Sequence, residues 1–230
     1  MKKLMRILLV IAALTLVLST AVGCSKKEET TDKPSSSQTT PESKPLESKP
    51  LESGESEAPK YDDATKQKLD EICAKGKELY DAKKYAEAKK VLKTALDIDP
   101  LFVPALELLS VACNFSVDYE NSVKYSDAII EANPNDSKGY YYKGLAFKAW
   151  KKLEDSIKWF TKATEINPKD TWSYYGIATI YADTNRKEPA LEFLKKAIDT
   201  NPKEVKKTAL AQDFHWQDFY NDPDFIALTK

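Results

Sequence analysis

The chain has 230 residues, with 36 acidic against 35 basic side chains and a formal net charge of −1. It has no strongly basic segment and only two arginines, Arg6 and Arg186, which argues against nucleic-acid binding. Apolar residues make up 42% of the chain, enough for one domain, but residues 25–60 contain very few of them. We therefore expect the folded part to span residues 61–230.

The first 23 residues have the layout of a secretory signal. Lys2, Lys3 and Arg6 precede an apolar run over residues 7–18, and small residues follow. The run is shorter than the ~20 residues that a membrane-spanning helix requires. We therefore predict a cleaved signal peptide over residues 1–23.

The apolar run ends in Ala21-Val22-Gly23-Cys24. This motif resembles the bacterial lipoprotein processing site, although the family most often has Leu where this chain has Ala21. The resemblance implies that Cys24 carries a lipid and becomes the mature N-terminus. The alternative is an uncleaved membrane helix with an incidental cysteine. In both cases the domain would be tethered outside the cytoplasm, and acyl chains would make the anchoring stable.

Residues 24–60 are predicted to be a disordered tether. They are rich in Ser, Thr, Glu, Lys and Pro and contain the near repeat ESKPLESKPLES. Such a segment buries too little apolar surface to offset its chain entropy. It is either a spacer that lifts the domain from the membrane or a solubilising leader without a length requirement.

Four prolines, Pro100, Pro134, Pro168 and Pro202, follow one another at intervals of 34 residues. Each comes after an Asp or Asn that follows apolar residues with helical spacing, and proline disfavours helix at the preceding residue. A helix stop at a fixed period of this length predicts stacked helical hairpins.

The positions within each period repeat as well. The third unit has Tyr140, Gly144 and Phe147 on its first helix and Ser156 and Phe160 on its second. This pattern closely resembles the tetratricopeptide repeat family. The resemblance implies an all-α, right-handed superhelix of tandem helical hairpins, with four repeats in residues 61–202 and a C-terminal capping helical segment in residues 203–230. The second unit fits least well, because Ser126 stands where a large residue is expected.

In this family the first helices of the repeats line a concave groove that binds peptides. Carried over by phase, the peptide-binding groove consists of Lys77, Tyr80, Glu107, Val111, Asn114, Tyr141, Leu145, Lys148, Trp172, Tyr175 and Thr179. We expect Tyr141, Trp172 and Tyr175 to form its aromatic centre, since the core is already supplied by other rings. The alternative is that the cap or the tether covers them.

A catalytic or metal site is not indicated. His215 is the single histidine and lies among aromatic residues, so we expect it to belong to the cap. The spacing of Cys73 and Cys113 does not match a zinc site, and none of the glycines forms a phosphate-binding loop. We expect no cofactor, no metal and no enzymatic activity.

The sequence thus predicts a lipid-anchored, extracytoplasmic protein–protein interaction module of the bacterial cell envelope, an adaptor or assembly factor. The anchor would hold it at the outer face of the cytoplasmic membrane, or at an outer membrane if the cell has one. The alternatives are a receptor for a small solute or cell-wall fragment and a non-catalytic subunit of an envelope enzyme.

Overall fold

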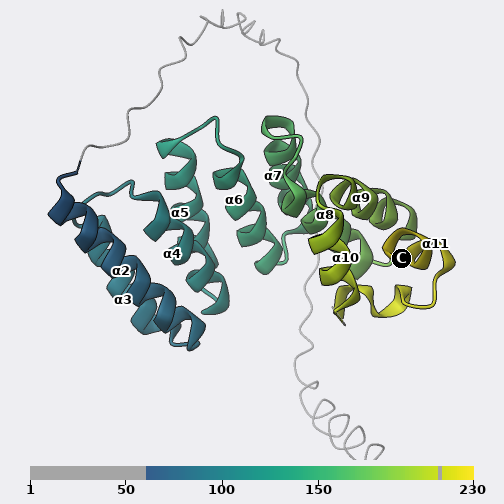
Figure 1. Cartoon of the computed structure of the whole chain (residues 1–230), viewed down its shortest axis with the longest axis horizontal. Coiled ribbons are helices and arrows are strands. Elements are labelled where there is room, and N and C mark those ends of the chain that lie inside the picture. Colours follow the sequence, from purple (N-terminus) through teal and green to yellow (C-terminus); the bar gives the residue numbers. More distant parts are fainter. Residues whose placement is uncertain (1–60, 212–213) are drawn as a thin grey trace, which may run out of the picture. The chain divides into compact units, whose positions relative to one another are not determined.

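The computed structural model describes residues 61–211 and 214–230 (Figure 1). The predicted signal peptide (1–23), the lipidated Cys24 and the tether (24–60) lie outside the described residues and stay predictions. The described helices are α2 (Asp63–Asp81), α3 (Tyr85–Leu96), α4 (Val103–Phe115), α5 (Tyr119–Ala132), α6 (Ser137–Ala149), α7 (Leu153–Ile166), α8 (Thr171–Asp183), α9 (Lys187–Thr200), α10 (Pro202–Leu210), the 3₁₀ helix η1 (Phe214–Phe219) and α11 (Pro223–Thr229).

The helices from α2 to α9 form four antiparallel hairpins, which confirms the predicted all-α array of tandem hairpins. The first helix of each hairpin packs on the second, and the second packs on the first helix of the next hairpin. The first helices α2, α4, α6 and α8 also contact one another in order, so they form one continuous layer (Figure 1).

The backbone repeats with the period of 34 residues at two places, in the turn within each hairpin and at the boundary after it. The turn inside each hairpin contains one residue with φ between 54° and 62°: Lys83, Val117, Lys151 and Asn185. At each hairpin boundary the side chain of Asp99, Asn133, Asn167 or Asn201 accepts a hydrogen bond from a backbone N–H two or three residues later. These turns stop one helix and set the direction of the next.

Small residues let the paired helices approach closely. A Cβ atom built on Gly144 would lie 2.5 Å from a ring carbon of Phe160, and one on Gly176 would lie 2.7 Å from other carbons of that ring. The ring of Phe160, which is fully buried, is therefore held between α6 and α8. Gly144 therefore lies at the contact between α6 and α7.

In the second hairpin, hydrogen bonds among serine hydroxyls replace the apolar contacts of the large residue expected at position 126. Ser110, Ser122 and Ser126 are fully buried, and the Oγ of Ser110 lies 3.0 Å and 3.1 Å from the other two hydroxyls. Tyr142 occupies the same repeat position as Gly176 and packs on this part of the core. The small Ser126 is thus compatible with a packed repeat.

The segment after the fourth hairpin covers the last repeat, as predicted for a cap. Trp216 and Phe225 are almost completely buried and stack with ring centroids 5.3 Å apart, in one cluster with α8 and α9 residues. The Nζ of Lys187 pairs with Asp222 at 2.6 Å and with Asp224 at 2.8 Å, which fixes the start of α11 to α9.

Candidate protein-interaction groove

Most of the predicted groove residues share the layer of first helices and reach its surface. Lys77 and Trp172 are exposed, and Trp172 keeps 40% of its surface. The half-buried ones are Tyr80, Glu107, Val111, Asn114, Tyr141, Leu145 and Lys148. The accessible part of the groove therefore belongs to α2, α4, α6 and the start of α8.

The expectation that Tyr175 and Thr179 lie open in the groove is wrong. Their exposed fractions are 8% and 1%, because η1 packs on this face of α8. The indole N–H of Trp216 donates a hydrogen bond of 3.0 Å to the hydroxyl of Tyr175. The Nζ of Lys148 donates to the hydroxyl of Thr179 at 2.6 Å and lies 3.4 Å from His215. The C-terminal segment thus fills the α8 end of the predicted groove.

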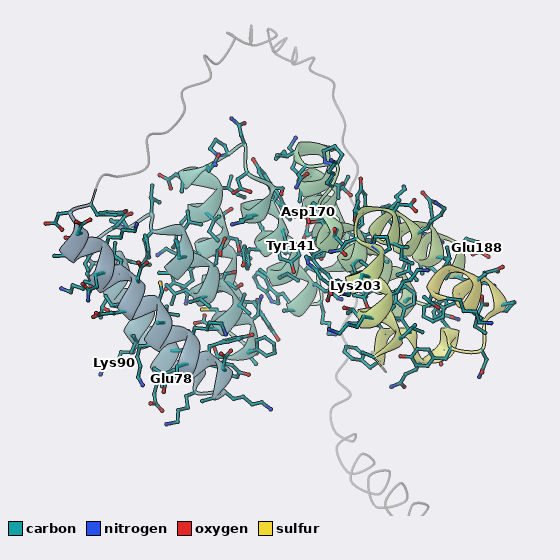
Figure 2. All side chains as sticks on the ribbon, viewed as in Figure 1. Glu78, Lys90, Tyr141, Asp170, Glu188 and Lys203 are labelled. Atoms are coloured by element: carbon teal, nitrogen blue, oxygen red, sulfur yellow. The ribbon has the colours of Figure 1, made fainter. Side chains whose placement is uncertain are left out.

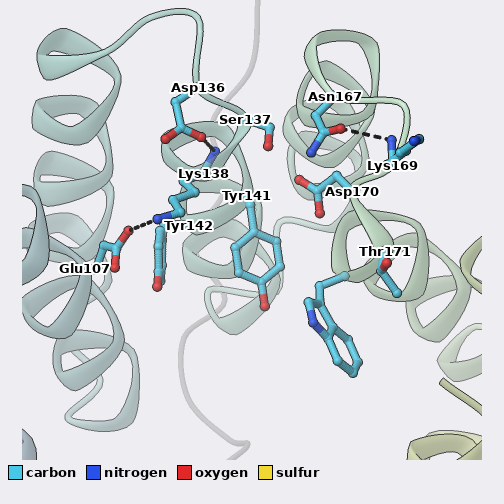
Figure 3. Close-up of a pocket in the computed structure, with 11 residues that line it drawn as sticks. Glu107, Asp136, Ser137, Lys138, Tyr141, Tyr142, Asn167, Lys169, Asp170 and Thr171 are labelled. Atoms are coloured by element: carbon cyan, nitrogen blue, oxygen red, sulfur yellow. Dashed lines mark hydrogen bonds and ion pairs between the residues drawn. The ribbon is translucent and has the colours of Figure 1, made fainter. Parts of the chain in front are cut away.

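A pocket of about 530 Å³ opens between α4, α6 and the start of α8 (Figure 3). Its lining combines the rings of Tyr141, Tyr142 and Trp172 with three carboxylates and two lysines. Figure 2 shows Tyr141 and Asp170 in the middle of the described array, whereas Lys90 lies on its outer side. The volume is in the range of ligand sites in proteins.

One side of the pocket is an ion pair with a buried carboxylate. Glu107 lies 3.6 Å from the Nζ of Lys138, and its side chain is 22% exposed. Burial raises the pKa of Glu107, while the neighbouring Lys138 opposes this shift. Burial also raises the pKa of Tyr142, and the negative charge of Glu107 raises it further. Both tyrosines of the pocket stay neutral at physiological pH, since burial raises the pKa of Tyr141 to about 12.

The starts of α6 and α8 also line the pocket. Asp136 and Asp170 cap α6 and α8, each by accepting a backbone N–H on one oxygen, from Lys138 at 3.0 Å and from Ser173 at 3.1 Å. The prediction did not include these aspartates or Tyr142 among the groove residues. The spacing Asn-Pro-x-Asp, repeated at 133–136 and 167–170, was the signal for the two aspartates.

At its α2 end the groove combines a surface ion pair with a cluster of aromatic rings. Lys77 pairs with Asp81 at 2.6 Å on the surface of α2. Tyr80 belongs to a ring cluster with Tyr85 and Phe115, with centroids 5.4 to 5.8 Å apart. Phe115 is 58% exposed, so this cluster borders the groove with accessible apolar surface.

The described residues contain no group of three or more His, Cys, Asp or Glu side chains that could hold a metal ion. Within the same ranges, no helix is both long and apolar enough to cross a membrane. Cys113 is fully buried and Cys73 is half-buried. Burial, reinforced by Asp118, raises the pKa of Cys113 to about 12, which makes this thiol unreactive.

Three segments of the chain match the model of a known family. Residues 72–100, 137–170 and 173–204 match the model of the tetratricopeptide repeat. A search of curated protein sequences finds no match.

Solved structures of similar fold include other arrays of this kind. A thermophilic TPR protein of Thermus thermophilus superposes with a TM-score of 0.58 at 18% identity, over 70% of this chain and 87% of that one. The pilF protein of Pseudomonas aeruginosa gives 0.57 at 14% identity, over 72% and 75%. MamA of Desulfovibrio magneticus RS-1 gives 0.50 at 20% identity, over 59% and 77%. At these identities the likeness concerns the fold.

Proposed function

We propose, from the premise that this chain contains tetratricopeptide repeats, that it is a membrane-anchored, extracytoplasmic module that binds a protein or peptide partner in its groove. Proteins with these repeats generally bind other proteins. The partner lies along α2, α4 and α6 and ends near Trp172, because the C-terminal segment already covers the next part of α8.

The pocket beside Trp172 is the observation that supports this function most. Its rings and carboxylates come from three successive hairpins. A large aromatic side chain that stays 40% exposed beside a pocket is typical of a binding surface, since aromatic side chains dominate interface energetics. The groove residues of α4 and α6 extend this surface beyond the pocket.

The membrane anchor in this proposal is Cys24. Its support is the sequence motif Ala21-Val22-Gly23-Cys24 after a signal-like segment. Lipidation there would hold the repeats at the outer face of a bacterial membrane, with residues 25–60 as the connection. The partner would then be another protein of the cell envelope.

Site-specific photo-crosslinking in living cells tests the groove. A photoreactive amino acid replaces Val111, which is half-buried on the groove side of α4, and in a control strain it replaces Lys90, which is exposed on the outer side of α3 (Figure 2). We expect one discrete adduct from position 111 and none of that mass from position 90. Adducts that form at position 90 alone would move the interface to the outer face.

A further inference from the structure

The pocket between α4, α6 and the start of α8 combines aromatic and acidic side chains in a way that selects one partner chemistry. We propose that it takes a lysine or arginine side chain of the bound peptide, beside the rings of Tyr141 and Trp172 and against the carboxylate of Asp170. This inference rests on the proposed function and names the residue type that the groove recognises.

The carboxylate of Asp170 is placed to receive a cation. It projects from the start of α8 toward Tyr141, across the pocket from Glu107 (Figure 3). One oxygen accepts the N–H of Ser173, and no other hydrogen bond or ion pair joins this carboxylate to the residues that the structure describes. Burial and, second to it, the charge of Asp170 raise the pKa of Tyr141.

Two aromatic side chains border the same space. Tyr141 packs its ring on Phe160 with the centroids 5.9 Å apart, which fixes its orientation. Trp172 contacts Tyr175 with centroids 5.8 Å apart and remains 40% exposed. Ring faces attract ammonium and guanidinium groups, most strongly where water is partly excluded. A carboxylate beside two such rings therefore favours a cationic side chain.

The charges of the pocket lining also favour a cationic ligand. Three carboxylates, of Glu107, Asp136 and Asp170, face two lysines, Lys138 and Lys169. Lys138 is engaged by Glu107 at 3.6 Å, and Lys169 is exposed and can turn into solvent. Asp136 and Asp170 then remain without a cationic partner among the described side chains.

An anionic ligand is the competing possibility, because the starts of α6 and α8 favour negative charge. Each of these helix starts is already capped by an aspartate of the pocket. A second negative charge would have to approach these carboxylates in a partly desolvated site, where like charges repel strongly. The cationic side chain is therefore the better fit.

Selection from a random peptide library tests the inference with the full chain as bait. We expect Lys and Arg to be enriched at one peptide position. Replacing that residue by norleucine in a selected peptide should weaken binding about tenfold, the change that corresponds to about 1.4 kcal/mol. An enriched acidic residue, or an enriched peptide without a preferred cation, would overturn the inference and leave the proposed function standing.

Matched variants connect the preference to the pocket. Asp170→Asn removes the charge, and Asn still caps α8. It should abolish the preference for Lys and Arg, whereas Asp62→Asn, the same change at the cap of α2, should leave it intact. Trp172→Leu should weaken the lysine peptide more than its norleucine analogue. If Asp170→Asn keeps the preference, the cation lies elsewhere. Failure to select any peptide would instead overturn the proposed function, and the inference with it.

Discussion

The turn residues Lys83, Val117, Lys151 and Asn185 adopt the left-handed conformation, which side chains other than Gly and Asn disfavour. Val117 is the least suited, because it is β-branched, and 71% of its surface is exposed, so little packing compensates for the strain. We expect Val117→Asn to raise the free energy of unfolding by roughly 1 kcal/mol in urea denaturation.

The reverse change at the equivalent turn is the control for this prediction. Asn185→Val places the same residue type in the same conformation, and Asn185 is also exposed. It should lower stability by a similar amount. Equal effects of both variants in the same direction would show that turn strain does not decide their stability.

Gly144 is a second residue whose replacement should change stability, because it leaves room for the ring of Phe160. A Cβ there would lie 2.5 Å from the ring of Phe160, which cannot move away because Gly176 contacts its other side. Gly144→Leu should cost about 1–3 kcal/mol by overpacking, more than the ~1 kcal/mol that helix propensity returns. Thr161→Ala, at an exposed site of α7, is the control that shows how much a change in helix propensity alone alters the free energy of unfolding. A mutant as stable as the parent in the same denaturation experiment would contradict the contact.

The role of Gly144 could be predicted because it recurs with the repeat, whereas that of Gly176 could not. Gly176 sits where Tyr142 stands in the preceding hairpin, so the repeat pattern does not require a small residue there. The size of the residue at this position depends on the residue that it faces in the preceding hairpin. Gly176 faces the large Phe160, whereas Tyr142 follows the hairpin in which the small Ser126 takes the place of Phe160. Such compensation is visible only when both helices are in place.

At the scale of helices, the C-terminal segment decides which part of the groove stays open. Its closing role was predictable, because the last repeat has an apolar face that must be covered. Its path was not, since residues 203–230 lie outside the period and cannot be phased against other repeats. This is why Tyr175 and Thr179 were expected in the open groove although η1 covers them.

We expect Trp216 to contribute much of the stability of the C-terminal segment on the last repeat. Its side chain is fully buried against Phe219, Phe225 and Tyr175, and its N–H is hydrogen-bonded. Trp216→Ala should cost about 3–5 kcal/mol of unfolding free energy. Phe214→Ala, two residues earlier at a 69% exposed side chain, should change it by less than about 0.5 kcal/mol. Thermal unfolding of both variants checks the contrast, and similar melting temperatures would contradict a packed cap.

At the scale of the whole molecule, the hairpins were predictable because each repeat contacts only its neighbours, so a local period determines the array. The pocket was only partly predictable. Tyr141 and Trp172 follow from their repeat positions, but Asp170 belongs to the boundary between repeats and enters the site through its role as a helix cap.

The anchor is a separate prediction for the complete chain. Cys24→Ala should abolish metabolic labelling with a palmitate analogue, because the acceptor thiol is lost. Cys73→Ala is the control, since this half-buried cysteine of α2 lies in the repeats. Labelling that persists in the Cys24 variant would exclude this cysteine as the lipidated residue.

If the partner binds in the groove beside Trp172, removal of this indole must weaken binding, and affinity measurements with the partner identified by crosslinking test this. Trp172→Ala is compared with Phe214→Ala, which removes another exposed aromatic side chain that does not line the pocket. Both variants should melt within a few degrees of the parent. We expect Trp172→Ala to weaken binding by on the order of thirtyfold, the equivalent of about 2 kcal/mol, and Phe214→Ala to change it less than about threefold. Unchanged affinity of the Trp172 variant, with its fold intact, would show that the partner does not bind beside Trp172.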